Sequence, residues 1–243
     1  MKVTLTRLIE NPVDAIEAAA SNCYDSKPSK SGKIMMHCFQ SGHHSVLEFA
    51  DFTFHIEGVS RALLAQITRH RIAGFAVRSQ RYCSEDGFEY VTPKTIMSNE
   101  EALKIYDDTM NYVRDSYQKL QQLGIPNEDA RMVLTNSCET ILECKMNGRE
   151  LMHFFNERLC SRAQWEIREL ALAMLKCLKE HDEQCLKFSQ MCGPKCERFG
   201  KDRAFCIEKS SCGRYPTLDE LTEGFYKYKQ FTEKQNEEMM EEI

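Results

Sequence analysis

The stretch from residue 58 to residue 84 is rich in arginine. It holds five arginines and no aspartate or glutamate: Arg61, Arg69, Arg71, Arg78 and Arg81. Arginine presents five N–H donors in a rigid fork, which suits a bidentate grip on phosphate or on the carbonyl groups of a heterocycle. Because five cations without an acid among them repel one another, we expect an external anion to complete the charge balance. The stretch therefore predicts a binding site for a nucleotide-like anion.

Within this stretch, residues 69–71 read Arg-His-Arg, and Ser79 follows after a spacer of seven residues. His70 could act as a general base, but neighbouring cations lower the pKa of a histidine, so a neutral hydrogen-bonding or stacking role is at least as well supported. Ser79 could act as a nucleophile. No base partner is identifiable for it, and a serine beside arginines more often donates a hydrogen bond to phosphate. We therefore expect binding roles for both residues.

Net charge limits the class of partner. The chain has 243 residues and a formal net charge of −5. A general nucleic-acid-binding domain is usually basic over a whole face, so the arginines are expected to form a local site for a small molecule and not to bind nucleic acid. A non-catalytic nucleotide or nucleic-acid module stays as the alternative that the arginines alone would allow.

Hydropathy and cysteine content bear on the location of the protein. No apolar run approaches the roughly 20 residues that span a bilayer, and the N-terminal residues lack the pattern of a secretory signal. Twelve cysteines without such a signal are typical of a reducing compartment, where thiols stay free or bind metal. We expect a cytoplasmic protein without a membrane segment.

Helices and strands that could position these residues alternate irregularly. We expect a strand at the N-terminus, a helix with Pro12 at its first position, a helix over 34–39 and a period-two strand over 48–57. A helix over 63–67 then leads into Arg69. Downstream we expect a short strand at 90–91, a long helix that begins with a capping box of Ser98 and Glu101, a helix over 127–134, a strand over 140–146 and two further helices.

This order of elements favours one fold class. It has no repeating βαβ unit and no glycine-rich phosphate loop of the Rossmann or Walker kind. We therefore expect an α+β fold, a mixed sheet packed with long helices in a single domain.

Four blocks of the sequence resemble the flavin-dependent thymidylate synthase family. The stretch from Arg69 to Tyr82 is similar to that family's Arg-His-Arg, seven-residue, Ser signature. The other blocks come in the family's order and cover Gly42, His43, Ser45, Glu48, Phe52 and Phe54, then Ala130, Arg131, Val133 and Leu134, then Asn147 and Arg149 together with Arg158, Ala163, Gln164, Glu166, Ile167 and Arg168. The resemblance covers about residues 1 to 185, and blocks in register are far more specific than a three-residue motif.

The resemblance implies an enzyme that converts dUMP to dTMP. Methylenetetrahydrofolate would be the carbon donor, FAD the redox cofactor and NADPH the reductant. The family is homotetrameric, with active sites at subunit interfaces. Reduced flavin would supply hydride to the methylene group on the pyrimidine, so the protein mainly aligns its ligands and holds their charges. No nucleophilic cysteine and no catalytic metal are expected.

The resemblance also assigns site residues. The dUMP contacts would be Gln66, Arg69, Ser79, Gln80, Arg81, Arg131 and Arg158. Arg158 resembles the arginine that polarises the uracil ring and is the expected catalytic residue. The FAD contacts would be Ser45, Glu48, Arg69, His70, Arg71, Asn147, Arg149 and His153, shared between subunits, and His43 would lie near the folate and nicotinamide face.

Some positions depart from the family pattern. Ala76 and Val77 stand where many members carry Asn and Glu, which removes a carboxylate that could contact dUMP. His153 occupies a position that is often Asn, and Arg162 one that is His in some members. These departures affect the detail of the ligand contacts more than the implied function.

The resemblance divides the chain into a catalytic domain over 1–187 and a cysteine-containing extension over 188–243. Four cysteines of the extension could satisfy a tetrahedral zinc ion, although their spacing is looser than that of a paired CxxC knuckle: Cys192, Cys196, Cys206 and Cys212. Free reduced thiols are the favoured alternative. A hydrolytic metal site at His43, His44 and His70 is weaker, because adjacent histidines diverge and the arginines would repel a cation.

Overall fold

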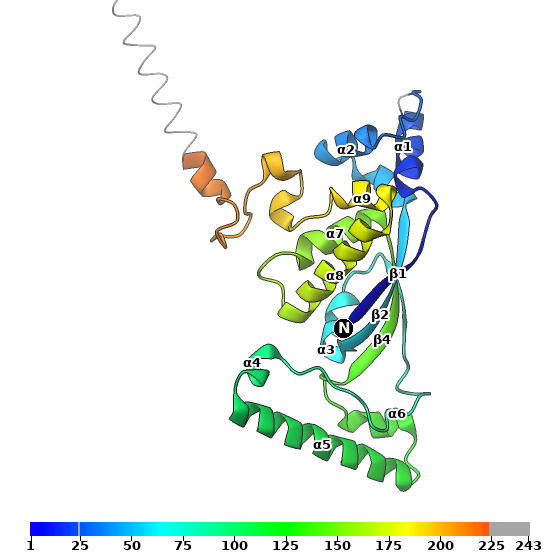
Figure 1. Cartoon of the computed structure of the whole chain (residues 1–243), viewed down its shortest axis with the longest axis vertical. Coiled ribbons are helices and arrows are strands. Elements are labelled where there is room, and N and C mark those ends of the chain that lie inside the picture. Colours follow the sequence, from blue (N-terminus) through cyan, green and yellow to red (C-terminus); the bar gives the residue numbers. More distant parts are fainter. Residues whose placement is uncertain (24, 224–243) are drawn as a thin grey trace, which may run out of the picture.

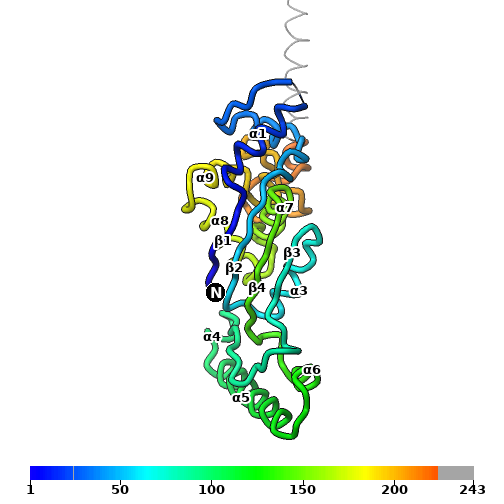
Figure 2. The backbone as a smooth tube through the Cα atoms, turned by 90° about the vertical axis from the view of Figure 1, so that its right-hand side faces the viewer, coloured from blue at the N-terminus to red at the C-terminus, as the bar shows by residue number. Residues whose placement is uncertain are grey.

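Four strands form one sheet within residues 1–23 and 25–223, the part of the chain that the computed structural model describes. Their order across the sheet is β1-β2-β4-β3 (Figure 2). The strands are β1 (Lys2–Leu8), β2 (Asp51–Ser60), β3 (Ala73–Val77) and β4 (Glu139–Asn147). Every neighbouring pair is antiparallel, so the α+β class is confirmed, whereas the expectation of a mixed sheet was wrong.

Alternation along the strands separates a buried face of the sheet from a polar one. In β2, Phe52, Phe54 and Ile56 are fully buried, while Thr53 and His55 between them are partly exposed. Period-two alternation of this kind points one set of side chains to the core and the other to the opposite face. The register pairs Asp51 with Asn147, so β2 begins beside the end of the antiparallel β4.

Helices pack on the buried face of the sheet (Figure 1). They follow one another along the chain as α3 (Arg61–Ile67), α7 (Gly148–Arg158), α8 (Trp165–His181) and α9 (Glu183–Ser189). The apolar faces of α7 and α8 meet the sheet through fully buried side chains that include Leu151, Phe154, Ile167 and Leu170. These side chains complete one core with those of β2 and β4.

The two ends of the sheet carry different helices (Figures 1 and 2). One end holds α1 (Pro12–Cys23), α2 (Lys33–Gln40) and the 3₁₀ helix η1 (His44–Phe49). The other end holds α4 (Lys94–Met97), the long α5 (Glu100–Gln122), α6 (Asn127–Ala130) and the 3₁₀ turn η2 (Arg131–Val133). Met110 and Tyr117 of α5 are buried, so one face of this helix packs inward.

Four details of the sequence-based expectation need correction. The cap of α5 is Asn99, whose side chain accepts a hydrogen bond from the Ala102 amide, so the expected Ser98 box does not form. The segment 127–134 divides into α6 and η2 instead of one helix. Tyr90 makes an isolated bridge with Cys138, and β3 was not foreseen because its alternation is short and contains glycine.

The segment after α9 has little regular structure over residues 190–217. It contains two 3₁₀ turns, η3 (Lys195–Glu197) and η4 (Lys201–Arg203), and an isolated parallel bridge between Cys206 and Thr217. Residues 224–243 of the expected extension lie outside the described part of the chain. Among the helices that are described, none has the length and apolar character that a bilayer crossing requires.

Candidate functional site

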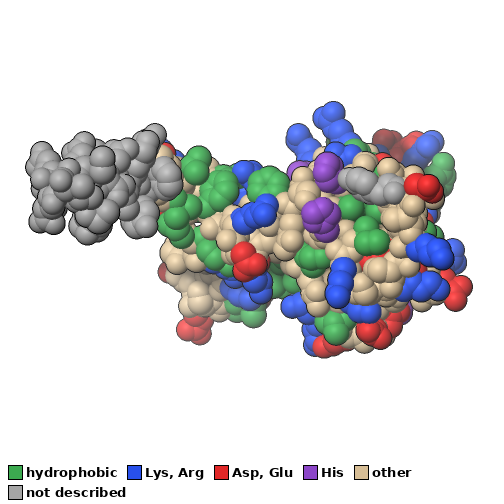
Figure 3. Space-filling model, turned by 90° about the horizontal axis from the view of Figure 1, so that it is seen from above, with side chains coloured by type: hydrophobic (Ala, Val, Ile, Leu, Met, Phe, Trp, Pro, Cys, Tyr) green, Lys and Arg blue, Asp and Glu red, His purple; other side chains and the backbone are tan. Residues whose placement is uncertain are grey.

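A cleft of about 610 Å³ opens between η1 and the first turns of α7. Ligand pockets commonly have volumes of roughly 300–1,000 Å³, so a cleft of this size can accept an organic ligand. Its lining comes from four parts of the chain and comprises His44, Glu48, Ile72, Asn147, Arg149, Glu150, Met152, His153, Asn156, Arg198 and Phe199. Seen from above, histidine side chains gather on one face of the molecule with lysine and arginine side chains around them (Figure 3).

The junction between β4 and α7 fixes the floor of this cleft. The Asn147 side chain caps α7 by accepting a hydrogen bond from the Glu150 amide at 2.8 Å. Gly148 lets η1 approach closely, because a Cβ atom there would lie 2.6 Å from the Leu47 carbonyl oxygen. Arg149 then reaches across the cleft to Glu48 in η1, with Nη1 and Oε1 2.6 Å apart. Two segments separated by about 100 residues are thus joined at the cleft.

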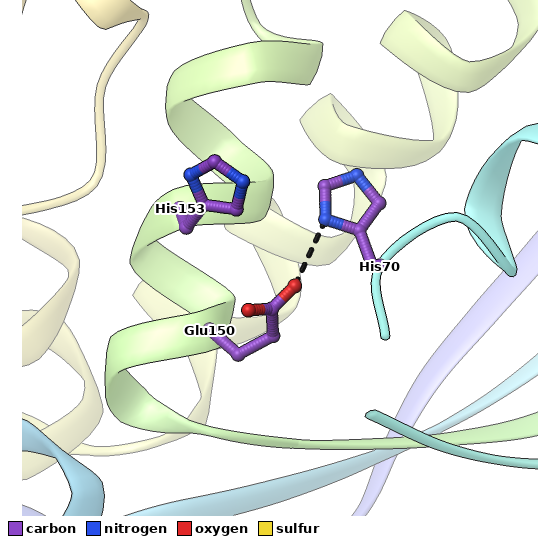
Figure 4. A group of neighbouring side chains, drawn as sticks. All are labelled: His70, Glu150 and His153. Carbon is purple, nitrogen blue, oxygen red and sulfur yellow. Dashed lines mark hydrogen bonds and ion pairs between the residues drawn. The ribbon is translucent and has the colours of Figure 1, made fainter. Parts of the chain in front are cut away.

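Beside the cleft, His70 connects α7 to the loop after α3. Its Nδ1 lies 3.0 Å from Oε1 of Glu150, and its Nε2 accepts a hydrogen bond from Nε of Arg158 at 3.1 Å. Figure 4 shows Glu150 and His153 on the same helix, with His70 facing Glu150 from the neighbouring loop. Since a guanidinium can only donate, Nε2 of His70 carries the lone pair and Nδ1 carries the proton. The imidazole is therefore neutral and donates to Glu150.

Burial and charge agree with this neutral state. His70 is 5% exposed, and burial, with smaller effects of Arg158 and His153, lowers its pKa from 6.5 to about 4. Burial also raises the pKa of Glu150 and lowers the pKa of Arg158. Desolvation disfavours the charged form of each group, which accords with a neutral imidazole at His70.

Two buried polar atoms at the cleft have no hydrogen-bond partner within residues 1–23 and 25–223. They are Oδ1 of Asn156 and Nε of Arg198, an acceptor and a donor. A buried polar group without a partner costs free energy, so a bound molecule with both donors and acceptors would be favoured there. The terminal nitrogens of Arg158 likewise make no hydrogen bond to a residue of the described ranges, and they remain able to bind a ligand.

The helix α3 leads into the Arg-His-Arg run and is anchored from α8. Ser60 caps α3, since its Oγ accepts a hydrogen bond from the Leu63 amide at 3.0 Å. The buried Glu166 carboxylate accepts from both the amide and the hydroxyl of Ser60, at 2.7 and 2.5 Å. Gln66 on this helix lies 3.4 Å from the Gln164 side chain that caps α8. Residues of the fourth sequence block therefore hold the element that presents the signature.

The arginines at the end of the signature form a second region, near α6. Arg81 makes an ion pair with Glu128 at 2.6 Å, and Nε of Arg131 donates to the Glu128 carbonyl oxygen at 3.1 Å. Arg78 pairs with Glu85 at 3.2 Å. The acid-free stretch thus acquires carboxylate partners from outside its own sequence, so Arg78 and Arg81 are balanced without the external anion expected for the cluster.

The sequence-predicted residues fall into distinct places. The cleft gathers Glu48, Asn147, Arg149 and His153, and His70 adjoins it through Glu150. Arg158 joins this group through His70. Around α6 and the start of β4 lie Ser79, Gln80, Arg81 and Arg131, with the Gln80 amide 3.7 Å from the Cys138 sulfur. Exposed positions outside the cleft lining hold His43, Ser45, Arg69 and Arg71.

Sequence reasoning missed Glu150, Asn156, Arg198 and Phe199 of the cleft. The buried Glu150 had a signal, because it lies three residues before His153 and so shares a helix face with it. Arg198 and Phe199 belong to the segment after α9 and offered no pattern, since a long-range contact brings them to α7. The sequence also gave no sign that Arg61 is half-buried. Burial lowers the pKa of its guanidinium.

The metal-site alternative at His43, His44 and His70 does not assemble. Within the described residues, the tight groups of metal-ligating side chains are His70, Glu150 and His153, and separately His181, Asp182 and Cys185. The first of these groups faces the Arg158 guanidinium, which would repel a cation. His44 instead has its Nε2 3.1 Å from the Phe39 carbonyl oxygen.

Known proteins resemble this chain over most of its length. The family model described as thymidylate synthase complementing protein matches residues 4–182. The flavin-dependent thymidylate synthase of Geobacter sulfurreducens is 42% identical over 191 residues, which cover 74% of this chain and 82% of that protein. The enzyme of the same name from Nitratidesulfovibrio vulgaris is 37% identical over 240 residues, or 88% and 95% of the two chains.

A solved structure shares the fold. The flavin-dependent thymidylate synthase of Helicobacter pylori, determined in complex with FAD and dUMP, superposes with a TM-score of 0.64 at 23% identity. The match covers 79% of this chain and all of that one. At this identity the likeness supports the α+β fold described above.

Proposed function

The chain belongs to the flavin-dependent thymidylate synthase family, and from this premise we propose that it converts dUMP to dTMP with methylenetetrahydrofolate as carbon donor, FAD as redox cofactor and NADPH as reductant. Relatives that carry the family's name are 37–42% identical over most of both chains. The proposal concerns the particular substrates and the residues that bind them.

One observation carries the proposal. Glu48, Asn147, Arg149 and His153, which the sequence resemblance assigns to FAD, line one cleft although they come from segments about 100 residues apart. The unpartnered Oδ1 of Asn156 and Nε of Arg198 in the same cleft suit a large ligand that has both donors and acceptors, as FAD has. When bound, FAD would supply the hydride for the reductive step.

In this proposal His70 and Glu150 act by holding Arg158. Because Nε2 of His70 accepts from Nε of Arg158, the guanidinium plane is fixed and its two terminal nitrogens are left to bind dUMP. A guanidinium against the pyrimidine carbonyl groups would stabilise negative charge as N3 ionises, which makes carbon 5 more nucleophilic. The lowered pKa of Arg158 reflects burial, and charge stabilisation is stronger where water is excluded.

The arginine region would bind the phosphate of dUMP. Arg81 and Arg131 meet at Glu128, and Ser79 lies two residues before Arg81. The Arg81 and Glu128 side chains are 56% and 46% exposed, and exposed ion pairs of this kind contribute about 0–1 kcal/mol. A phosphate could therefore displace Glu128 from Arg81 at little cost. Gln66, Arg69 and Gln80 complete the proposed dUMP set, and Ser45 and Arg71 the proposed FAD set.

We further propose that the enzyme is a homotetramer whose subunits share each site, with His43 facing the folate and nicotinamide. The outward face of α5 supports this, since Ile105, Tyr112 and Leu123 are 62%, 74% and 78% exposed. Their spacing places them on one side of the helix and its C-terminal continuation. Large exposed apolar patches commonly mark protein interfaces. The division into residues 1–187 and 188–243 and a cytoplasmic location also belong to the proposal.

Anaerobic spectroscopy of the purified full chain tests the function. We expect the absorbance of bound FAD, a spectral change on addition of dUMP, bleaching by NADPH, and dTMP formation once methylenetetrahydrofolate is present. Protein that stays colourless after incubation with FAD would refute the proposal. Tight binding of oligonucleotides with a steep salt dependence, in place of flavin, would support the nucleic-acid alternative.

A further inference from the structure

Four cysteines line a second cavity, of about 270 Å³, between residues 159–172 and the segment after α9. Cys160 lies in that loop and Cys196 in η3, while Cys206 and Cys212 belong to the irregular segment that follows. None of the four forms a disulfide in the described part of the chain; Cys212 is exposed and the others are partly buried. Ligand-forming side chains from three separate stretches thus meet at one place.

We propose that Cys160, Cys196, Cys206 and Cys212 form a structural zinc site that fastens residues 190–217 to the catalytic domain. That segment has two 3₁₀ turns and one isolated bridge as its regular structure among the described residues. A segment with so little core is usually stabilised by a covalent or metal crosslink. Four thiolates satisfy the tetrahedral coordination of a structural zinc ion.

The proposed set replaces one residue of the sequence-based zinc hypothesis. Cys192 does not line the cavity: its sulfur donates to the Phe188 carbonyl oxygen at 3.7 Å, and burial strongly raises the pKa of its thiol. Cys160 takes its place, from a part of the chain that the spacing of the C-terminal cysteines could not indicate. Metal binding at this set would therefore link the extension to the core, which the original four cysteines would not do.

Charge at the cavity suits a tetrathiolate site. Arg168, Lys195 and Arg214 line it, and its lining contains no carboxylate. Lys195 pairs with Glu208 at the edge, and Arg214 lies 3.7 Å from Glu197. Zinc with four thiolates carries a net charge of −2, so neighbouring cations stabilise the complex, and cations also favour the deprotonation that zinc binding needs.

Zinc binding would draw the four thiols together. They are not among the tight ligand groups, with mutual distances below 4.8 Å, that the described residues form. Tetrahedral zinc–sulfur bonds of about 2.3 Å bring sulfur atoms to about 3.8 Å from one another. Two contacts already hold the segment near this arrangement, since Arg162 donates to Ser210 at 2.8 Å and the Cys206 amide donates to Pro216 at 2.7 Å.

Metal analysis of the full-length protein tests the proposal. Protein purified with reduced thiols and given excess zinc should retain about one zinc ion per chain after gel filtration, and a mercurial thiol reagent should release it. Cobalt in place of zinc should give the intense charge-transfer absorption of thiolate ligands. Cys160→Ser and Cys196→Ser should lower bound metal at least tenfold, whereas Cys192→Ser should leave it unchanged.

Two further measurements guard against misfolding and against other sites. Cys212→Ser changes an exposed residue, so the variant should keep its circular dichroism while it loses bound metal and cobalt charge-transfer absorption as Cys160→Ser and Cys196→Ser do. The proposal is overturned if the reduced wild-type protein retains no zinc, or if peptide mapping finds disulfides among the four cysteines in freshly isolated protein. Loss of the metal in His153→Ala but not in Cys196→Ser would also overturn it. None of these readouts depends on flavin or on turnover.

Discussion

The two arginine-bearing regions of the molecule differ in how their cations are held. Arg158 is half-buried and bonded to a neutral histidine, which is fixed in turn by a buried glutamate. Arg81 is more than half exposed and paired with an exposed carboxylate. Buried polar contacts hold one geometry because breaking them leaves unpaired groups, whereas exposed ion pairs exchange at little cost. One region is therefore built for orientation and the other for exchange of anions.

The largest effect on turnover should come from removing the side chain of Arg158. Arg158→Ala should lower turnover by about 10²–10³-fold, as expected for loss of one fixed donor to a developing negative charge. FAD content and the fold should be retained. Initial rates of dTMP formation and the flavin absorbance measure both effects, with Arg7→Ala on the exposed side of β1 as the matched control. Normal turnover in the variant would refute the catalytic role of Arg158.

Acid titration tests the buried network. The pKa of His70 falls from 6.5 in the unfolded chain to about 4 in the folded one, so the unfolded state takes up the proton first as pH drops. The stability contribution is full above pH 6.5 and is lost between pH 6.5 and about 4, by about 3 kcal/mol at about 1.4 kcal/mol per pKa unit. Urea unfolding of the wild type and of His70→Gln measures it.

The raised pKa of Glu150 acts in the opposite direction, because the folded state then binds that proton more tightly as pH falls. Repeating the comparison in a Glu150→Gln background removes this second titration. Equal losses of stability in the wild type and in His70→Gln between pH 6.5 and 4 would show that His70 is not held neutral.

The next largest effect should come from adding a Cβ atom at Gly148, where η1 closely approaches α7. Gly148→Ala should lower the free energy of unfolding by about 1–3 kcal/mol, because the added Cβ would lie 2.6 Å from a backbone oxygen. FAD affinity should fall with it, since Glu48 and Arg149 meet across this contact. Gly74→Ala is the matched control, with 3.9 Å to its nearest neighbour, and should change stability by less than about 0.5 kcal/mol.

In the exposed region, substitution of either Arg81 or Glu128 tests whether a phosphate replaces Glu128 as the partner of Arg81. Arg81→Ala should raise the KM for dUMP about tenfold, the loss expected from one charge-assisted contact of about 1.4 kcal/mol, and leave FAD affinity unchanged. Glu128→Gln frees Arg81 and should leave that KM equal or lower it. A rise of KM in Glu128→Gln as large as in Arg81→Ala would mean that the ion pair itself builds the site.

The smallest effect is expected for Arg71, whose substitution tests whether this residue contributes to FAD binding. This exposed residue lies outside the cleft lining, one position from Ile72, which belongs to it. Arg71→Ala should weaken FAD binding a few-fold, as an exposed charge contact would. Flavin titration measures the change, and unchanged affinity would show that this arginine faces elsewhere.

Much of the fold and part of the site could be predicted from the sequence. Periodicity located β2, β4, α1 and α5, since their apolar residues alternate or recur as a strand or helix requires. The sequence placed His70 within the Arg-His-Arg signature. It could not give the hydrogen-bond partners of His70, because Glu150 and Arg158 lie 80 and 88 residues away. The Glu128 carboxylate, which pairs with Arg81 from 47 residues away, was likewise invisible, because no local pattern encodes a tertiary ion pair.

Because β4 continues directly into α7, the register of β4 fixes where the first turn of α7 lies in the cleft. Asp51 faces Asn147 across the ladder, and Asn147 is both the last residue of the strand and the cap of the helix. Sliding β4 by one residue would shift the cap by about 3.3 Å and turn its side chain to the opposite face of the sheet. Insertions or deletions within β4 should therefore abolish flavin binding, whereas length changes in the loop around residue 209 should be tolerated.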